Sequence, residues 1–174
     1  MKREKEKEIL RRVRVPTPAG AVVLVLRGSA LAGLAFEDRW RGLSVSLARR
    51  FGKFTFKENL QAETVAEALR RYFAGDLHAL DPIEVDTGGT AFQESVWRAL
   101  RRIPAGTTWT YARLAREIGR PTATRAVAAA NGANPVSIVI PCHRVIGSDG
   151  SLTGYGGGLP RKRWLLVHEG ALLL

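Results

Sequence analysis

The apolar positions in the first half of the chain follow the spacings of strands and helices in turn. Residues 21–26 are apolar throughout and rich in valine, which predicts a strand covered on both faces; the turn at Gly28-Ser29 predicts a hairpin with the next apolar run. The spacings predict strands at 13–18, 21–26, 31–36 and 53–57, and helices at 40–51 and 65–73. We therefore expect a small α/β domain over residues 1–80, without a catalytic constellation.

A run of mixed charges precedes the first of these strands. Residues 2–12 are mostly Lys, Arg and Glu and show no clear period. We expect residues 1–12 to form a flexible tail, with a frayed helix as the alternative, and we assign this segment no function.

The periodicity stops after the second helix and returns as a helical pattern. Residues 76–90 are rich in Gly, Asp and Pro, and we place an interdomain linker at 81–90. Thr90 and Gln93 have the spacing of a capping box, which predicts the start of a helix. A mostly helical domain is expected over residues 91–174.

Two short helices in this second half are separated by a tight turn. The sequence predicts them at 111–118 and 122–131, with Thr110 as a cap of the first and Gly119-Arg120-Pro121 between them. This arrangement is the pattern of a helix-turn-helix. A last helix is expected at 161–169, between Pro160 and Gly170.

The composition of the second of these helices indicates what it contacts. Arg125 is its single charged residue, and alanines surround it. A thin helix of this kind approaches a groove closely, although the same alanines also suit packing against a neighbouring helix. The chain carries a formal net charge of +11, which favours a polyanion, nucleic acid before an anionic membrane. We therefore favour DNA contact.

Cysteine usage limits the chemistry further. Cys142 is the only cysteine, which excludes an internal disulfide and a multi-cysteine metal site, so we expect no metal and no cofactor. A free thiol favours a reducing compartment, and we see neither a membrane-spanning run nor a signal-peptide core. The expected location is the cytoplasm, without a membrane partner.

The segment around this cysteine holds the candidate chemistry. The apolar run 136–140 predicts a buried strand leading to Cys142, and Pro141 is expected to force a turn there. A thiol needs a base to become a nucleophilic thiolate, and His143 is adjacent, to act directly or through a water. A Cys-His pair by itself is more often structural than catalytic. Upstream, Asn134 can lock a turn, and Glu169 can orient a histidine.

These residues closely resemble a known family, the O6-alkylguanine-DNA alkyltransferases. The resemblance is specific over about residues 92–170 and weak before them, where the family has a variable α/β domain of RNase H-like type. It rests on the following motifs: Asn134-Pro135, Pro141-Cys142-His143-Arg144-Val145, Thr153-Gly154-Tyr155, Leu165 to Gly170, Phe92-Gln93 with Val96-Trp97, Ile103 to Thr107, Tyr111 with Leu114-Ala115, and Arg125-Ala126-Val127.

The resemblance implies a role for each matching residue. Cys142 would accept the alkyl group, His143 would take its proton through a water, Glu169 would hold His143, and Asn134 would brace the turn. Arg125 would enter the DNA in place of the flipped nucleotide, with Tyr111 on the guanine and its phosphate. The implied DNA-binding set is Arg125, Tyr111, Thr122, Ala123 and Ala126. The implied substrate pocket is Val145, Tyr155, Gly156, Gly157, Lys162, Ser137 and Asn131.

The resemblance also implies the reaction and its partner. A single-turnover transfer would consume the protein, because the thioether formed has no carbonyl for water to attack. The substrate would be double-stranded DNA with O6-alkylguanine, flipped out through the minor groove, and O4-alkylthymine is a further candidate. We expect a monomer, with cooperative binding to DNA left open. Ser137, Gly156 and Asn131 replace bulkier or different residues of some members, which implies a pocket that is roomier or more mobile.

Three other functions remain as alternatives. A thiol hydrolase with a Cys-His-Glu set would turn over and would need an oxyanion hole. An alkyltransferase-like damage binder would lack the cysteine that this chain has. A transcription factor would leave the Cys-His-Glu set without a role.

Overall fold

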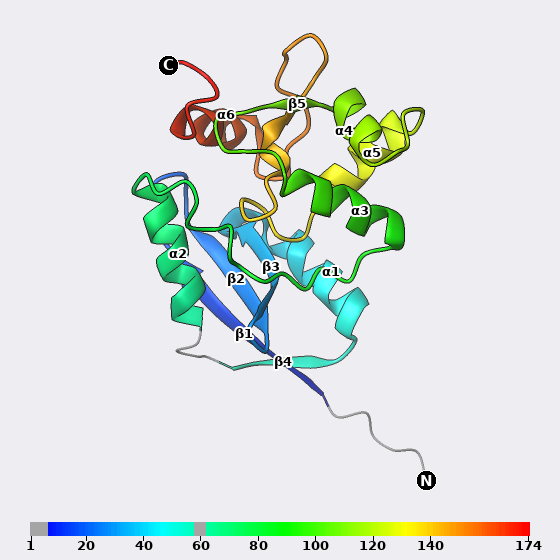
Figure 1. The fold of residues 1–174 in the computed structure, drawn as a ribbon. Coiled ribbons are helices and arrows are strands. Elements are labelled where there is room, and N and C mark those ends of the chain that lie inside the picture. The colour runs from blue at the N-terminus through cyan, green and yellow to red at the C-terminus, as the bar shows by residue number, and fades with distance from the viewer. Residues whose placement is uncertain (1–6, 58–61) are drawn as a thin grey trace.

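The N-terminal part of the chain folds as a mixed β-sheet with two helices. The computed structural model describes residues 7–57 and 62–174 (Figure 1). The sheet has the order β3-β2-β1-β4, in which β1 pairs antiparallel with β2 and parallel with β4, and β2 pairs antiparallel with β3. Its elements are β1 (Glu8–Val15), β2 (Val22–Arg27), β3 (Ala30–Phe36), α1 (Trp40–Phe51), β4 (Phe54–Lys57) and α2 (Glu63–Phe73). The predicted α/β layer is confirmed.

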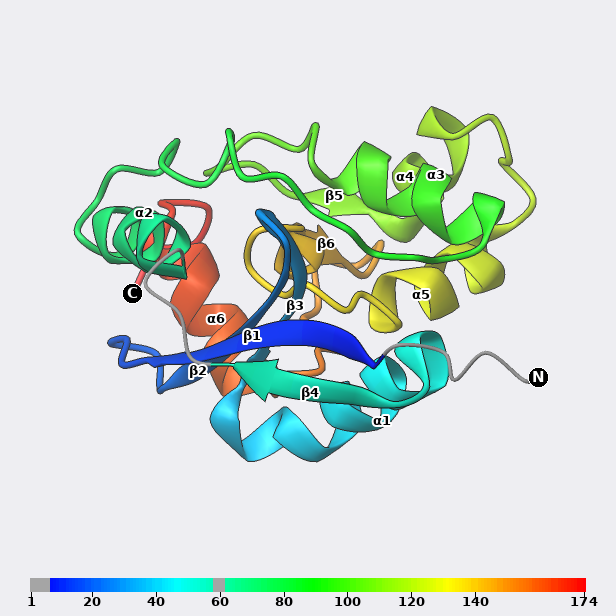
Figure 2. The ribbon, with the colours of Figure 1, turned by 90° about the horizontal axis from the view of Figure 1, so that it is seen from below.

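The two faces of the sheet belong to two separate clusters of buried side chains. Val25 of β2 faces α1, where it packs with Leu43 and Leu47, while Leu24 and Leu26 face the opposite side. Figure 2 shows α1 under one face, and α2 together with the C-terminal helices on the opposite side. The alternation along β2 explains why residues 22–26 are all apolar, since both faces of the strand are covered.

The first strand corrects the prediction of a charged tail. Residues 8–12, expected to belong to a flexible segment, form the first half of β1, and residues 1–6 lie outside the described part of the chain. Leu10 is fully buried, while the side chain of Arg12 lies over the rings of Trp40 and Phe56. Leu10 and Arg12 thus lie on the α1 side of the sheet, and Val13 and Val15 lie on the other side. The apolar and charged residues of β1 therefore do not separate by face, and the sequence shows no simple alternation.

The edge strand β3 receives two segments from later in the chain. Leu31 exchanges backbone hydrogen bonds with Glu84 and Asp86, and Leu34 does so with Pro135 and Ser137, at 2.9 and 3.0 Å. These bonds occupy a strand edge that would otherwise be free to pair with other chains. They also attach the segment that leads to Cys142 directly to the N-terminal sheet.

The second half of the chain is mostly helical. Its helices are α3 (Ala91–Leu100), α4 (Tyr111–Glu117), α5 (Thr124–Gly132) and α6 (Leu159–His168), and the short strands β5 (Trp109–Thr110) and β6 (Val145–Ile146) pair in parallel. The capping box of Thr90 and Gln93 is present, and the Thr110 hydroxyl accepts the Arg113 N–H. Both caps confirm the predictions. Helix α5 begins two residues later than predicted, and the pair β5–β6 was not predicted.

We expect Leu47→Ala to lower the free energy of unfolding by about 2–5 kcal/mol, because it opens a cavity between α1 and the sheet. Val45 lies on the same helix with 45% of its surface exposed, against 2% for Leu47. The control Val45→Ala should therefore change the same quantity by less than about 0.5 kcal/mol. Urea unfolding followed by circular dichroism measures both, and equal effects would contradict this packing.

Candidate active site

Two successive three-residue turns present the thiol. The Val139 N–H donates to the Ser137 carbonyl around Ile138, and the Cys142 N–H donates to the Ile140 carbonyl around Pro141, both at 2.8 Å. Pro141 has φ −81° and ψ 63°, which is an inverse γ-turn, and residues Cys142–Arg144 continue as the 3-10 turn η3. The predicted turn at Cys142 is confirmed.

The strand predicted at 136–140 is wrong. Val136 pairs with β3, but the chain then turns at Ile138, whose φ of 72° is the only positive value among the non-glycine residues that the structure describes. A β-branched residue in this region is strained by about 1–3 kcal/mol, so the surroundings must hold it. The Ile138 side chain is buried, which anchors the turn in the core.

Asn134 spans the turn that precedes the thiol. Its amide nitrogen donates to the Ile140 carbonyl at 2.8 Å, and its amide oxygen accepts the Val136 N–H at 2.9 Å. Both groups of one side chain therefore join the two ends of the segment 136–140. This geometry agrees with the bracing role expected for Asn134.

The environment of Cys142 keeps its thiol protonated at rest. The side chain is buried, and burial raises the pKa of the thiol above its ordinary value. The Asn134 side chain, the charge of Lys162 and backbone hydrogen bonds act in the opposite direction without cancelling this effect. The thiol therefore needs a nearby base to react as a thiolate near neutral pH.

His143 can supply that base. It is fully buried, and burial lowers the pKa of its imidazole, more than the Glu169 carboxylate raises it. Its Nε2 lies 2.9 Å from Glu169 Oε1, and its Nδ1 has no hydrogen-bond partner among the described residues. A neutral imidazole that donates from Nε2 to a carboxylate has Nδ1 as a free acceptor.

Two residues that the sequence did not single out complete the surroundings of Glu169. Arg144 donates from Nε to Oε2 at 3.0 Å and from Nη2 to Oε1 at 2.8 Å, and the Tyr72 hydroxyl donates to Oε1 at 2.7 Å. Burial alone would raise the pKa of Glu169, but His143 and Arg144 hold it well below its ordinary value. The carboxylate thus stays ionised although it is buried.

The predicted pocket residues gather on either side of the thiol segment. Ser137, Gly156 and Gly157 line a groove of about 780 Å³ that α1 closes on its other side. A Cβ at Gly157 would lie 2.7 Å from the Tyr155 ring, so this position requires glycine, whereas Gly156 has open space around it. Asn131, Val145, Tyr155 and Lys162 do not line this groove.

Besides His143 Nδ1, two further polar atoms are buried without a partner among the described residues. They are the Tyr155 hydroxyl and the Asn131 amide oxygen. The Tyr155 ring centre lies 6.4 Å from that of His143, and burial raises the pKa of its hydroxyl well above the ordinary value. Tyr155 therefore remains a hydrogen-bond donor at any pH the fold tolerates. A buried donor and a buried acceptor of this kind suit a polar ligand, since each is costly to leave unpaired.

Lys162 fixes the loop that carries Tyr155. Its ammonium donates to the Val145 carbonyl at 2.5 Å and to the Thr153 carbonyl at 2.7 Å, and the Tyr111 hydroxyl donates to the same Thr153 carbonyl at 3.4 Å. Burial lowers the pKa of Lys162 to about 8. Lys162, predicted to line the substrate pocket, therefore uses its ammonium to hold two backbone carbonyls of the protein.

Four of the five predicted DNA-binding residues lie at or near the N-terminus of α5, whereas Tyr111, at the start of α4, is half-buried against the core. Thr122, Arg125 and Ala126 are exposed, and Ala123 is half-buried at the N-cap of α5. Val127 and Ala130 face inward, and the Ala130 carbonyl accepts the indole N–H of Trp97 at 2.8 Å. Helix α5 thus has one alanine-lined face in the core and another that carries Arg125.

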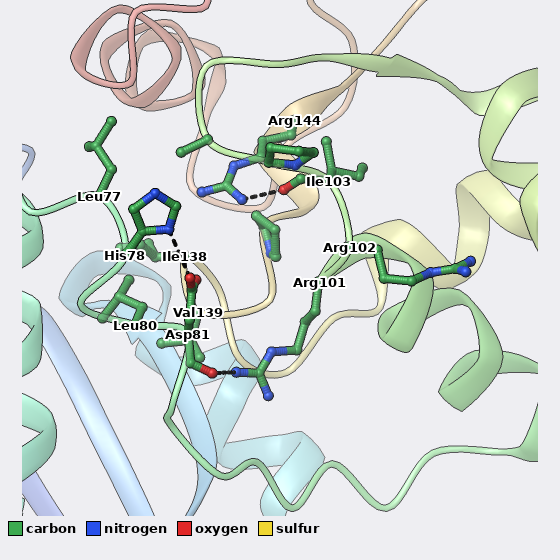
Figure 3. Close-up of a pocket in the computed structure, with 13 residues that line it drawn as sticks. Leu77, His78, Leu80, Asp81, Arg101, Arg102, Ile103, Ile138, Val139 and Arg144 are labelled. Carbon is green, nitrogen blue, oxygen red and sulfur yellow. Dashed lines mark hydrogen bonds and ion pairs between the residues drawn. The ribbon is translucent and has the colours of Figure 1, made fainter.

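A second cavity lies on the other side of the thiol segment (Figure 3). Its volume is about 270 Å³. One wall is formed by the thiol segment, through Ile138, Val139, Pro141 and Arg144. The opposite wall is formed by residues 77, 78, 80, 81 and 101–105. Neither Cys142 nor His143 lines it, and neither lines the groove at Ser137. We place the candidate chemistry beside Tyr155 because its ring faces that of His143.

Neither a metal site nor a membrane span emerges from the described residues. Over 7–57 and 62–174, no three His, Cys, Asp or Glu side chains gather as metal ligands would. None of the helices there is both long and apolar enough to cross a membrane.

Comparisons with known proteins match nearly the whole chain. Residues 91–171 match the family model described as 6-O-methylguanine DNA methyltransferase, DNA binding domain. A methylated-DNA–protein-cysteine methyltransferase of Salmonella typhimurium is 61% identical over 165 residues, which cover 92% of this chain and 96% of the relative. One of Mycolicibacterium paratuberculosis is 48% identical over 89% of each chain.

Solved structures agree with the sequence relatives. The Mycobacterium tuberculosis protein OGT, crystallised in complex with DNA, superposes with a TM-score of 0.74 at 38% identity and covers 94% of this chain and 93% of its own. The O6-methylguanine-DNA methyltransferase of Pyrococcus kodakaraensis gives a TM-score of 0.73 at 27% identity, over 92% and 99% of the two chains. The resemblance found in the sequence is confirmed: the chain belongs to the methylated-DNA–protein-cysteine methyltransferase family.

Proposed function

We propose that this protein repairs DNA by transferring the alkyl group of O6-alkylguanine to its own Cys142, once per chain. The observation that carries the proposal is the buried set of Cys142, His143 and Glu169, in a domain that matches the DNA-binding model of the family. A buried thiol with a neutral imidazole beside it is protected from solvent until a substrate enters. That protection suits a nucleophile that can be used only once.

The first chemical step is removal of the thiol proton. His143 Nδ1 accepts the proton through a water, and the imidazolium formed is stabilised by the Glu169 carboxylate at Nε2. The thiolate then attacks the alkyl carbon in line with the C–O6 bond. The S–C bond forms as the C–O6 bond breaks, and the bonding electrons leave with the guanine oxygen.

The leaving group needs a donor near O6. Tyr155 fits this role because its hydroxyl is buried and unpaired within the described residues, and because burial raises its pKa well above the ordinary value, which favours the protonated donor. A hydrogen bond from this hydroxyl to O6 stabilises the charge that develops as guanine leaves. The proton taken from the thiol returns to the guanine ring, so that the products are a neutral guanine and a thioether at Cys142.

Access to the base requires extrusion from the duplex. Unstacking costs a few kcal/mol, and an inserted side chain offsets part of that cost. Arg125 is exposed on the alanine-lined face of α5, with Thr122, Ala123 and Ala126 beside it, which suits close approach to the minor groove. The net charge of +11 favours binding to phosphates without sequence preference.

The partner and location follow from this chemistry. The proposed substrate is duplex DNA with O6-alkylguanine. O4-alkylthymine is a second candidate substrate, because Ser137 and Gly156 border a wide groove. A reactive thiol that must stay reduced suits the cytoplasm, and the curated relatives described above are bacterial. We propose that the protein acts there as a monomer.

Incubation with a duplex that carries O6-methylguanine should add one CH₂ unit of mass to the chain, on the peptide that contains Cys142. The yield should reach one alkyl group per protein and then stop, because a thioether is not hydrolysed. Intact-mass spectrometry with peptide mapping measures both. Cys142→Ala should bind the duplex without any increment; many turnovers per chain would instead indicate a hydrolase.

Arg125→Ala should slow repair of the duplex by about tenfold or more, because the variant lacks the side chain that replaces the extruded base. The reaction with a free alkylated guanine base should be unchanged. Arg98→Ala is the matched control, since it removes one exposed positive charge from α3. Equal losses with duplex and free base would refute the role of Arg125.

The rate of transfer to Cys142 should be level through neutral pH and should fall below a midpoint that lies under about 6.5, the ordinary pKa of histidine. The sign follows from burial, which lowers the pKa of His143, so that the imidazole remains a base until the pH drops below that value. In His143→Gln the rate should instead rise with pH across the neutral range, since it then depends on the thiolate fraction. Single-turnover kinetics from pH 5 to 9 distinguish the two profiles.

A further inference from the structure

We propose that Tyr72, in helix α2 of the N-terminal layer, is a positioning residue for the alkyl transfer and acts through Glu169 on His143. This inference rests on the function proposed above. It assigns to the N-terminal half of the chain a part in the reaction, although that half holds no residue of the Cys-His-Glu set.

The contact is direct and buried. The Tyr72 hydroxyl donates to Glu169 Oε1 at 2.7 Å, and this same oxygen lies 2.9 Å from His143 Nε2. Tyr72 and His143 are both fully buried, and Glu169 is 5% exposed. One carboxylate oxygen therefore joins a side chain of α2 to the candidate base.

A second hydrogen bond fixes the position of this hydroxyl. The Nε2 of His168 lies 2.8 Å from the backbone carbonyl of Tyr72, and the His168 ring also packs against the Tyr72 ring with centres 5.1 Å apart. Consecutive residues of α6 and its C-cap, His168 and Glu169, thus contact the backbone and the hydroxyl of one tyrosine. The carboxylate cannot rotate away from His143 without losing the Tyr72 bond.

Packing alone does not account for the tyrosine. A phenylalanine would make the same ring contacts with Phe73 and His168, and it would avoid the burial of a hydroxyl. The hydroxyl is useful where the carboxylate must stay ionised in a buried site. Burial, and then the charge of Glu169, raises the pKa of Tyr72, so that its hydroxyl is a donor at every working pH.

The charged groups around His143 define the expected effect. Glu169 favours the imidazolium, while Arg144 from η3 and Lys162 from α6 oppose it. The Tyr155 ring also faces His143, with the ring centres 6.4 Å apart. A donor on Oε1 weakens the pull of that oxygen on the imidazole proton. Loss of the Tyr72 hydroxyl should therefore make Glu169 a stronger acceptor, raise the pKa of His143 and leave the carboxylate less firmly oriented.

The test is Tyr72→Phe in the full chain. The acid midpoint of alkyl transfer from O6-methylguanine duplex should move up by about half a pH unit or more, and the rate at pH 7.5 should fall about threefold or more. The dissociation constant for the duplex should not change. An unchanged midpoint together with an unchanged rate would overturn the proposal.

Phe73→Leu is the matched control for packing. Phe73 is the neighbour of Tyr72 and contacts the rings of Trp164 and His168, but it has no polar group. Its substitution should lower the melting temperature without moving the acid midpoint. If Phe73→Leu moves the midpoint as far as Tyr72→Phe does, the effect comes from packing and the hydroxyl has no positioning role.

Two further measurements test the Tyr72 hydroxyl independently of DNA repair and of packing. The pH dependence of Cys142 alkylation by iodoacetamide reports the same base without DNA, so it separates a failure of this inference from a failure of the proposed repair function. Replacement of Tyr72 by 3-fluorotyrosine keeps the ring and strengthens the donor. It should move the midpoint down, opposite to Tyr72→Phe, and an upward shift would contradict the mechanism.

Discussion

The buried carboxylate of Glu169 is the interaction on which the rest of the site depends. An ionised carboxylate inside a protein is unstable unless its oxygens are satisfied by donors and by opposite charge. Here Arg144 binds both oxygens, and His143 and Tyr72 share Oε1. These contacts keep the charge in place, and the charge sets the orientation of His143. The imidazole then presents Nδ1 on the side away from Glu169, where a proton from the thiol can be accepted.

The backbone around the thiol depends on the N-terminal sheet. The segment that leads to Cys142 pairs with the edge strand β3, and Asn134 joins its two ends. Only with these supports can Ile138 keep a positive φ, and only then do two turns fit within a few residues. The sheet, the turns and the carboxylate therefore act together, because each fixes one part of the Cys142–His143 geometry. The N-terminal layer thus supports the reaction without contributing a reacting atom.

Local patterns predicted much of this arrangement. Helix caps at Thr90 and Thr110, the α/β order of the first half and the turn at Pro141 depend on residues close in sequence, and the structure has all of them. The residues themselves suggested a turn at Asn134 and a histidine oriented by Glu169, and the resemblance added their roles. The structure has both contacts, while the roles stay predictions. The linker boundaries at 81–90 and the roles of the pocket residues stay predictions.

The failures have physical causes that the sequence hides. Charged residues at 8–12 concealed a strand, since long side chains such as Arg12 cover aromatic rings while they reach solvent. The apolar run 136–140 predicts a strand, but its residues are buried because they form turns packed in the core. Tyr72 and Arg144 were missed because their partner, Glu169, lies 97 and 25 residues away, and no periodicity reports such contacts.

His143 can serve as the base only if it is neutral, which its burial favours against the pull of Glu169, and if Glu169 holds its proton on Nε2 so that Nδ1 is free to accept. ¹⁵N NMR of the histidine side chains at pH 7, with His143 assigned by a His143→Gln variant, measures the protonation of each nitrogen directly. The expected result is a neutral His143 imidazole with its proton on Nε2, the nitrogen that faces Glu169. An imidazolium at this pH, or a proton on Nδ1, would contradict it.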